Sequence, residues 1–176
     1  MATRSKRPAK KVRKSKAAAK TVKPIPAGYP AVTPYLRVRS TAHALEFYKK
    51  AFGAREKGRM AAPDGRVMHA EMAVFGTVVM LSDEFPDRGA LSPESLKGSP
   101  VGLFVYTRDV DGAIARAAAA GATVTMPAQD MFWGDRFGTI RDPFGHDWQF
   151  ATHKEDVAEK EMRRRFEAML AQPNRP

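Results

Sequence analysis

The stretch that decides the fold is MFWGDRFGTIRDPFGHDW, residues 131–148, which holds both tryptophans of the chain. Within it, Asp142-Pro143-Phe144-Gly145 has Asp at the first position of a tight turn, Pro at the second and Gly at the fourth. This order is typical of a type I turn, so the flanking segments are predicted to be the two strands of a hairpin. The polar residues around the turn could form a reaction centre, contact a ligand, or only border the hairpin.

The same order of elements occurs twice along the chain, with an offset of 69 residues. Equivalent positions are Ser40 and Asp109 at the helix starts, Leu45 and Ile114 on the buried helix faces, and Phe75-Gly76 and Phe144-Gly145 at the hairpin turns. A β-α-β-β-β unit present in two copies predicts an α+β fold and excludes a solenoid. The predicted folded region, 29–170, comprises module one (30–83), a loop (84–99), module two (100–153) and a C-terminal helix (156–170).

Side-chain alternation predicts which residues of a strand share a face. In segment 31–40, Thr33, Tyr35 and Arg37 lie on one face. In segment 67–74, His69 and Glu71 share a face, and the opposite row, which suits the side facing the helix, is apolar and consists of Met68, Ala70, Met72 and Val74. For the last helix, Asp156 and Glu159 form a variant of the capping box.

The basic character of the chain is concentrated at its N-terminus. The net charge is +11, but residues 1–24 contain ten Lys and Arg and no acidic residue, so the other 20 basic residues nearly balance the 19 acidic ones. Residues 1–28 are therefore predicted to be a disordered tail. Residues 1–24 could weakly contact nucleic acid or another polyanion, or act only as a solubilising extension.

Composition also limits the class of protein. The chain has no cysteine, which excludes disulfides and thiolate zinc sites. It contains no apolar run of membrane-spanning length and no hydrophobic leader at its N-terminus. We therefore expect a cytoplasmic protein with no membrane contact.

Three segments together resemble the vicinal oxygen chelate superfamily, which comprises the glyoxalase, bleomycin-resistance and dioxygenase fold. They are LRVRSTAHALEFYKKAFGA, VYTRDVDGAIARAAAAGATV and GTIRDPFGHDW, and the match extends over about residues 30–153. The motifs PDGRVMHAEM, LSDEFP and WGDRFGTIRDPFGHDW are similar to the PhnB-like subgroup. The resemblance implies that each sheet curves around half of a cleft and that the protein is a homodimer, with its modules paired within one chain or between chains.

Metal-dependent members of the superfamily carry a His or carboxylate on the first and last strand of each module, which together hold a divalent ion. The equivalent positions here are Thr33, Met80, Gly102 and Gln149. These residues are poor ligands for a hard ion, because glycine offers no side chain and a thioether prefers soft metals. We therefore expect no metal and no other cofactor, with a divalent metal as the alternative.

The resemblance implies a small organic molecule bound in the cleft between the modules. Trp133 could stack on a flat ligand and Arg136 could pair with an anionic group. Alternatively, an Asp135–Arg136 turn could only brace the hairpin while Trp133 covers the edge of the core. The candidate ligand-binding residues are Tyr35, Arg37, His69, Glu71, Met80, Phe104, Trp133, Arg136 and Gln149, with Tyr106 and Ile140 expected on the same wall.

His69 and Glu71 leave three interpretations open. They could be the acid–base pair of a lyase, isomerase or dioxygenase-type enzyme, because a near-neutral imidazole beside a carboxylate suits proton transfer. They could contact a ligand without catalysis, or they could only satisfy each other as a polar pair. A nucleic-acid-associated protein, docked through the basic tail, is a further alternative.

Overall fold

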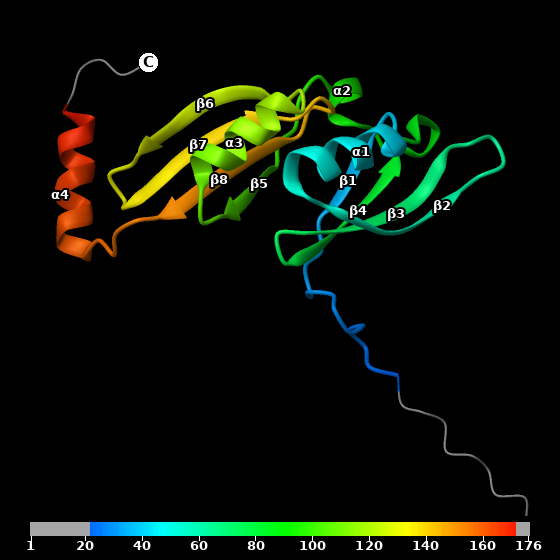
Figure 1. Cartoon of the computed structure of the whole chain (residues 1–176), viewed down its shortest axis with the longest axis horizontal. Helices are drawn as coiled ribbons and strands as arrows, with labels where there is room; N and C mark the ends of the chain where they lie inside the picture. The colour runs from blue at the N-terminus through cyan, green and yellow to red at the C-terminus, as the bar shows by residue number, and fades with distance from the viewer. Residues whose placement is uncertain (1–21, 172–176) are drawn as a thin grey trace, which may run out of the picture.

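The computed structural model describes residues 22–171 and contains two four-stranded mixed sheets (Figure 1). The first sheet has the order β1-β4-β3-β2, formed by β1 (Tyr35–Val38), β2 (Arg55–Ala61), β3 (Val67–Val74) and β4 (Thr77–Asp83). The second has the order β5-β8-β7-β6, formed by β5 (Gly102–Tyr106), β6 (Thr123–Asp130), β7 (Asp135–Arg141) and β8 (Asp147–His153). The predicted α+β fold with two βαβββ modules is confirmed. The tail predictions for residues 1–21 lie outside the described residues.

The strand registers confirm the internal repeat. In module one, β1 runs parallel to β4 with Tyr35 opposite Met80, and in module two, β5 runs parallel to β8 with Phe104 opposite Gln149. Both members of the second pair lie 69 residues after those of the first.

The helix starts repeat in the same way. The backbone N–H of Thr41, the first residue of α1 (Thr41–Phe52), donates to Asp83 Oδ1 at 2.6 Å. Its equivalent in α3 (Val110–Ala119), the N–H of Val110, donates to Thr152 Oγ1 at 3.0 Å. In each module, a side chain from the end of the last strand thus satisfies an N–H group of the helix's first turn.

The two hairpins differ by one residue, which changes the face on which Ile140 lies. Glu71 pairs with Met80 nine positions later, whereas Thr139 pairs with Gln149 ten positions later. A shift of one residue moves a side chain to the opposite face of a strand. Ile140 is therefore fully buried in the core, and its expected position on the cleft wall is wrong.

A similar shift affects the start of β3. The pairing of β2 with β3 changes register after Met60, which lies opposite His69, so that Ala61 lies opposite Val67. Val67 is consequently buried, while Met68 is 38% exposed and does not belong to the predicted apolar row. The other members of that row, Ala70, Met72 and Val74, are buried as predicted.

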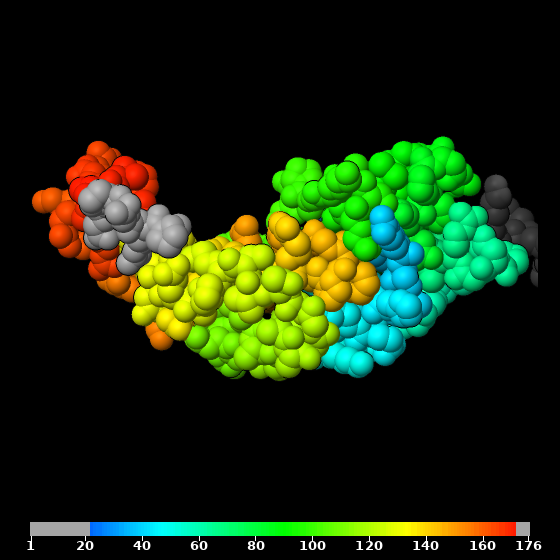
Figure 2. All heavy atoms as spheres, turned by 90° about the horizontal axis from the view of Figure 1, so that it is seen from above, coloured from blue at the N-terminus to red at the C-terminus, as the bar shows by residue number. Residues whose placement is uncertain are grey.

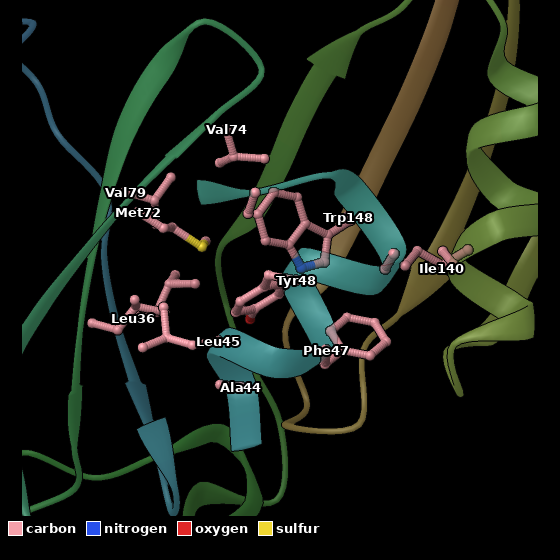
Figure 3. Packing of buried hydrophobic residues seen from close by; sticks show 14 of the residues in the cluster. Leu36, Ala44, Leu45, Phe47, Tyr48, Met72, Val74, Val79, Ile140 and Trp148 are labelled. Carbon is pink, nitrogen blue, oxygen red and sulfur yellow. The ribbon is translucent and has the colours of Figure 1, made fainter. Parts of the chain in front are cut away.

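The modules are joined by a shared core. Helix α1 packs on β1, β3 and β4, α3 packs on β6, β7 and β8, and the two helices pack against each other. Trp148 of β8 inserts beside Tyr48 of α1 (Figure 3), with ring centroids 5.6 Å apart. The predicted turn completes this junction, because the buried Asp142 carboxylate accepts hydrogen bonds from the Tyr48 hydroxyl at 2.7 Å and Trp148 Nε1 at 2.9 Å.

The predicted loop 84–99 contains a 3-10 turn, η1 (Pro86–Arg88), and the short helix α2 (Pro93–Leu96). The last helix, α4 (Glu159–Leu170), begins three residues later than predicted. Asp156 does not cap it, because the Asp156 carboxylate instead lies 2.9 Å from His153 Nε2. Figure 2 shows a hollow between α4 (red) and the segment that contains α2 (green). Within residues 22–171, no helix has the length and apolar character needed to cross a membrane.

Candidate functional site

A chain of hydrogen bonds crosses the face of the first sheet opposite α1. The Tyr35 hydroxyl lies 3.0 Å from His69 Nδ1, and His69 Nε2 lies 3.2 Å from Glu71 Oε1. The other oxygen of Glu71 accepts a hydrogen bond from the Tyr29 hydroxyl. An ionised carboxylate only accepts, so in a neutral His69 ring Nε2 carries the proton and Nδ1 accepts from Tyr35.

Positive charge and hydrogen bonding keep Glu71 ionised. Lys57 Nζ lies 3.5 Å from Glu71 Oε2 and 4.2 Å from the centre of the Tyr29 ring. The hydrogen bond from Tyr29, together with His69 and Lys57, holds the pKa of Glu71 below its usual value. Because the Glu71 side chain is only 19% exposed, these partners replace much of its hydration.

Two further predicted residues lie beside this chain. The Arg37 guanidinium lies 4.2 Å from the centre of the Tyr35 ring and donates to the Ser82 hydroxyl. Met80 lies opposite both Tyr35 and Glu71 in the strand registers. Five predicted site residues are thus grouped in module one: Tyr35, Arg37, His69, Glu71 and Met80.

The face of the second sheet opposite α3 is aromatic. Phe104 stacks on Phe137 with an interplanar angle of 20°, and the Phe104 and Tyr106 ring centroids lie 5.1 Å apart. The Trp133 ring packs edge-to-face with Phe137, with the two ring centroids 5.8 Å apart. The side chains nevertheless remain accessible, since Phe104 is 48% and Tyr106 65% exposed.

A buried carboxylate, Asp135, orients these rings. Its Oδ2 accepts hydrogen bonds from the Tyr106 hydroxyl at 3.3 Å and from Trp133 Nε1 at 3.1 Å, and its Oδ1 lies 2.7 Å from His153 Nδ1. The negative charge of Asp135 raises the pKa of Tyr106. Asp135 is only 4% exposed, so the rings around it are held by contacts that water cannot easily replace.

His153 lies between two carboxylates, and this position predicts a pH dependence. The hydrogen bonds to Asp135 and then to Asp156 raise the pKa of the ring above its usual 6.5. The folded state therefore favours protonated His153. The resulting stabilisation is fully present below the pKa of the unfolded chain, and it is lost as the pH rises through the raised pKa of the folded state.

We therefore expect the urea midpoint of unfolding to fall as the pH rises from about 6 to about 9. In His153→Gln this part of the pH dependence should disappear. A midpoint that changes equally with pH in both proteins would contradict the assignment, and NMR titration of the His153 ring would measure its pKa directly.

Arg136 does not join the other candidate residues. Its guanidinium binds both carboxylate oxygens of Asp111 in α3, at 2.6 and 2.7 Å, and lies 3.3 Å from Asp130. Arg136 therefore stabilises the side of β7 that α3 covers, whereas its neighbour Asp135 contacts the aromatic face. Trp133 and Arg136 thus have separate environments.

The four positions equivalent to metal ligands do not fit a hard divalent ion. Thr33 precedes β1 and donates to the Pro30 carbonyl at 3.1 Å. A Cβ added to Gly102 would lie 3.0 Å from Gln149 Nε2, so the Gln149 amide fills the space where a ligand at position 102 would stand. Met80 supplies only a thioether. Among residues 22–171, no group of three or more His, Cys, Asp or Glu side chains could hold a metal ion.

Two pockets border these faces. A pocket of about 310 Å³ lies between the β3–β4 hairpin and β5, and its lining includes Phe75, Phe104 and Trp148. A second, of about 480 Å³, lies between Glu71 and Met80 and the N-terminal segment that carries Tyr29. In the described part of the chain, no hydrogen bond or ring contact joins the module-one group to Phe104 or Gln149.

The fold consists of two βαβββ modules, and in each module a helix covers one face of the sheet while the other face is open. This arrangement is the class of fold that the sequence motifs resemble. Residues 29–150 match the Glyoxalase/Bleomycin resistance protein/Dioxygenase superfamily, and the chain belongs to this superfamily.

Relatives of the chain include proteins of different bacteria. An uncharacterized protein of Mycobacterium tuberculosis is 43% identical over 131 residues, which are 73% of this chain and 77% of the relative. The crystal structure of TioX from Micromonospora sp. ML1 is similar, with 31% identity and a TM-score of 0.55 over 69% of this chain and 96% of that chain. A PhnB protein from Bacillus cereus shares the fold, with 20% identity and a TM-score of 0.53 over 70% of this chain and 99% of that chain.

Sequence reasoning missed Tyr29, Lys57 and Asp135 as parts of these networks. Tyr29 lies at the predicted boundary of the folded region, where no periodic pattern indicates a contact. Lys57 lies in a strand that is mostly exposed, and nothing local distinguishes it from other surface lysines. The sequence favours a turn that pairs Asp135 with Arg136, whereas the partners of Asp135 come from β5, β8 and the Trp133 turn.

Proposed function

We propose that the protein binds a small, partly aromatic organic molecule without a metal ion, between the polar face of module one and the aromatic face of module two. The observation that carries this proposal is the Phe104–Tyr106–Phe137 group of contacting rings, in which Phe104 and Tyr106 are exposed and buried Asp135 holds the Tyr106 hydroxyl. Exposed rings that are already ordered lose little conformational entropy when a flat ligand stacks on them. The hydrogen-bonding groups of module one would supply a few oriented polar contacts.

We also propose that a second copy of the chain completes the site. Because α1 packs on α3, the two open sheet faces of one chain lie on separate sheets. Both faces expose apolar side chains, including Tyr35, Met60, Phe104 and Tyr106. Pairing between chains would bury this surface and bring a polar face opposite an aromatic one.

This dimer predicts a mass twice that of the 19.4 kDa chain in sedimentation velocity. Tyr106→Asp should dissociate it, because a carboxylate would be buried at the interface beside Asp135. Leu170→Asp on α4 is the matched control, since Leu170 and Tyr106 are both 65% exposed. If Leu170→Asp dissociates the dimer and Tyr106→Asp does not, the assigned interface is wrong.

Ligand binding can be tested with N-phenyl-1-naphthylamine, an uncharged aromatic probe that the basic tail does not attract electrostatically. We expect saturable binding and a Kd about tenfold higher in Phe104→Ala, a loss of about 1.4 kcal/mol. Phe166→Ala is the control, because Phe166 on α4 is 43% exposed, close to the 48% of Phe104. Equal effects of the two substitutions would contradict the proposal.

A second candidate function is an enzyme that uses His69 and Glu71. The specific observation in its favour is that both ring nitrogens of His69 are engaged, one by Tyr35 and one by Glu71. A polar pair that only satisfied itself would not need the Tyr35 contact.

A further inference from the structure

The segment that precedes β1 is held against module one mainly by one side chain. Among the described residues, the Tyr29 hydroxyl makes the one side-chain hydrogen bond that joins residues 22–33 to the sheet, and its acceptor is Glu71. We infer that Tyr29 is a latch that holds this segment closed over Glu71, and that the segment must open before a ligand can contact the polar face. This inference rests on the proposed function, because the latch controls access to the same binding face.

The latch occupies the carboxylate that module one would offer to a ligand. The Tyr29 hydroxyl donates to one oxygen of Glu71, and His69 Nε2 lies 3.2 Å from the other. Lys57 Nζ is a third partner, 3.5 Å from Glu71 Oε2 and 4.2 Å from the centre of the Tyr29 ring. A ligand that hydrogen-bonds to Glu71 must therefore displace Tyr29.

The segment covers a space that a ligand could occupy. The pocket between the segment and the sheet has a volume of about 480 Å³, and its lining includes Ile25, Tyr29 and Met80. This volume lies within the range of ~300–1,000 Å³ that is typical of small-molecule sites. Residues 24–26 of the lining precede residue 29, where the match to the superfamily begins. The cover is therefore built partly outside the modules that the superfamily shares.

The rest of the segment is weakly held, so that a closed and an open arrangement can both be populated. Val22 is 90% and Val32 85% exposed, and the backbone bends at Ala31 and Val32, between Tyr29 and β1. Figure 1 shows most of the segment (blue) extending away from both sheets. Segments with few buried contacts open at a low cost in free energy. A ligand that binds only the open arrangement then has an apparent affinity reduced by the open fraction.

Closure can be measured without a ligand, by acetylating the full chain with N-hydroxysuccinimidyl acetate and mapping the modified lysines by mass spectrometry. Only a deprotonated amine reacts, and Tyr29 and then Glu71 raise the pKa of Lys57. In Tyr29→Ala we therefore expect Lys57 to react about fivefold faster. Lys49 is the internal control and should react at an unchanged rate. Its side chain is 37% exposed, against 35% for Lys57, and its pKa is likewise raised, by Glu46.

The effect of the latch on binding can be measured with N-phenyl-1-naphthylamine, whose N–H group can donate to Glu71. We expect its Kd to be about fivefold lower in Tyr29→Ala than in the parent chain. Val32→Ala is the control variant, because Val32 belongs to the same segment but is exposed. It should change neither the Kd nor the Lys57 rate. Since coupling between two equilibria is reciprocal, saturating probe should also accelerate the acetylation of Lys57 in the parent chain.

A Lys57 rate that stays within about twofold of the parent rate in Tyr29→Ala would overturn the inference. A Kd that stays the same or rises in this variant would also overturn it, because the segment would then be a wall of the ligand site or have no part in binding. Failure of the probe to bind either protein would instead contradict the proposed function. The acetylation of Lys57 would still decide whether Tyr29 holds the segment closed, so the two failures are distinguishable.

Discussion

Replacing Asp142 by Ala is expected to lower the free energy of unfolding by about 3 kcal/mol, because it leaves two buried donors without an acceptor. The donors are the Tyr48 hydroxyl and Trp148 Nε1, at 2.7 and 2.9 Å from Asp142 Oδ2. Asp142 Oδ1 also accepts the backbone N–H groups of Phe144 and His146, which closes the turn. The carboxylate therefore holds the turn of module two against the first helix of module one.

Urea denaturation followed by tryptophan fluorescence measures this effect. Asp147→Ala is the matched control, since Asp147 forms a surface pair with Arg141 at 2.8 and 3.0 Å. Such exposed pairs contribute about 1 kcal/mol or less. If Asp142→Ala lost no more stability than Asp147→Ala, Asp142 would not be the link between the modules.

Gly134→Ala is expected to cost about 3 kcal/mol of folding stability through two effects that act together. The backbone of Gly134 has a φ of 97°, which side-chain-bearing residues rarely adopt. An added Cβ would also lie 2.2 Å from the Glu155 carbonyl oxygen and 2.9 Å from Val157 Cγ2. The chain that leads to α4 would have to move away from the turn that carries Trp133.

The control for this substitution is Gly98→Ala, where an added Cβ meets no atom within 4 Å and the φ angle is not positive. We expect its free energy of unfolding to stay within about 0.5 kcal/mol of the parent value. Thermal unfolding compares the melting temperatures of the two variants. Similar melting temperatures would refute the role assigned to Gly134.

Much of the fold could be predicted because its signals are local and repeated. The offset of 69 residues between Ser40 and Asp109 also relates the observed pairs of Tyr35 with Met80 and Phe104 with Gln149. The offset fails at Ile140 because the second hairpin contains one additional residue, and alternation cannot reveal where an insertion lies.

The candidate site was less predictable because the residues that contact one another in it are distant in sequence. Alternation correctly placed His69 and Glu71 on one face, but their contacts with Tyr29 and Tyr35 depend on how β1 and the preceding segment lie beside β3. The polar residues of the stretch 131–148 likewise have different roles. Asp142 joins the modules, Asp135 anchors aromatic rings, and Arg136 pairs with α3.

The proposed function requires that the protein binds its ligand without the divalent ion that bridges the modules in metal-dependent members of the superfamily. The most direct measurement is the Kd of N-phenyl-1-naphthylamine for the full chain after treatment with EDTA, compared with the Kd after addition of Zn²⁺, Mn²⁺ or Ni²⁺. We predict saturable binding by the metal-free protein, with a Kd unchanged within about twofold by any of the ions. Binding that is absent after EDTA treatment and restored by one of these ions would contradict the account.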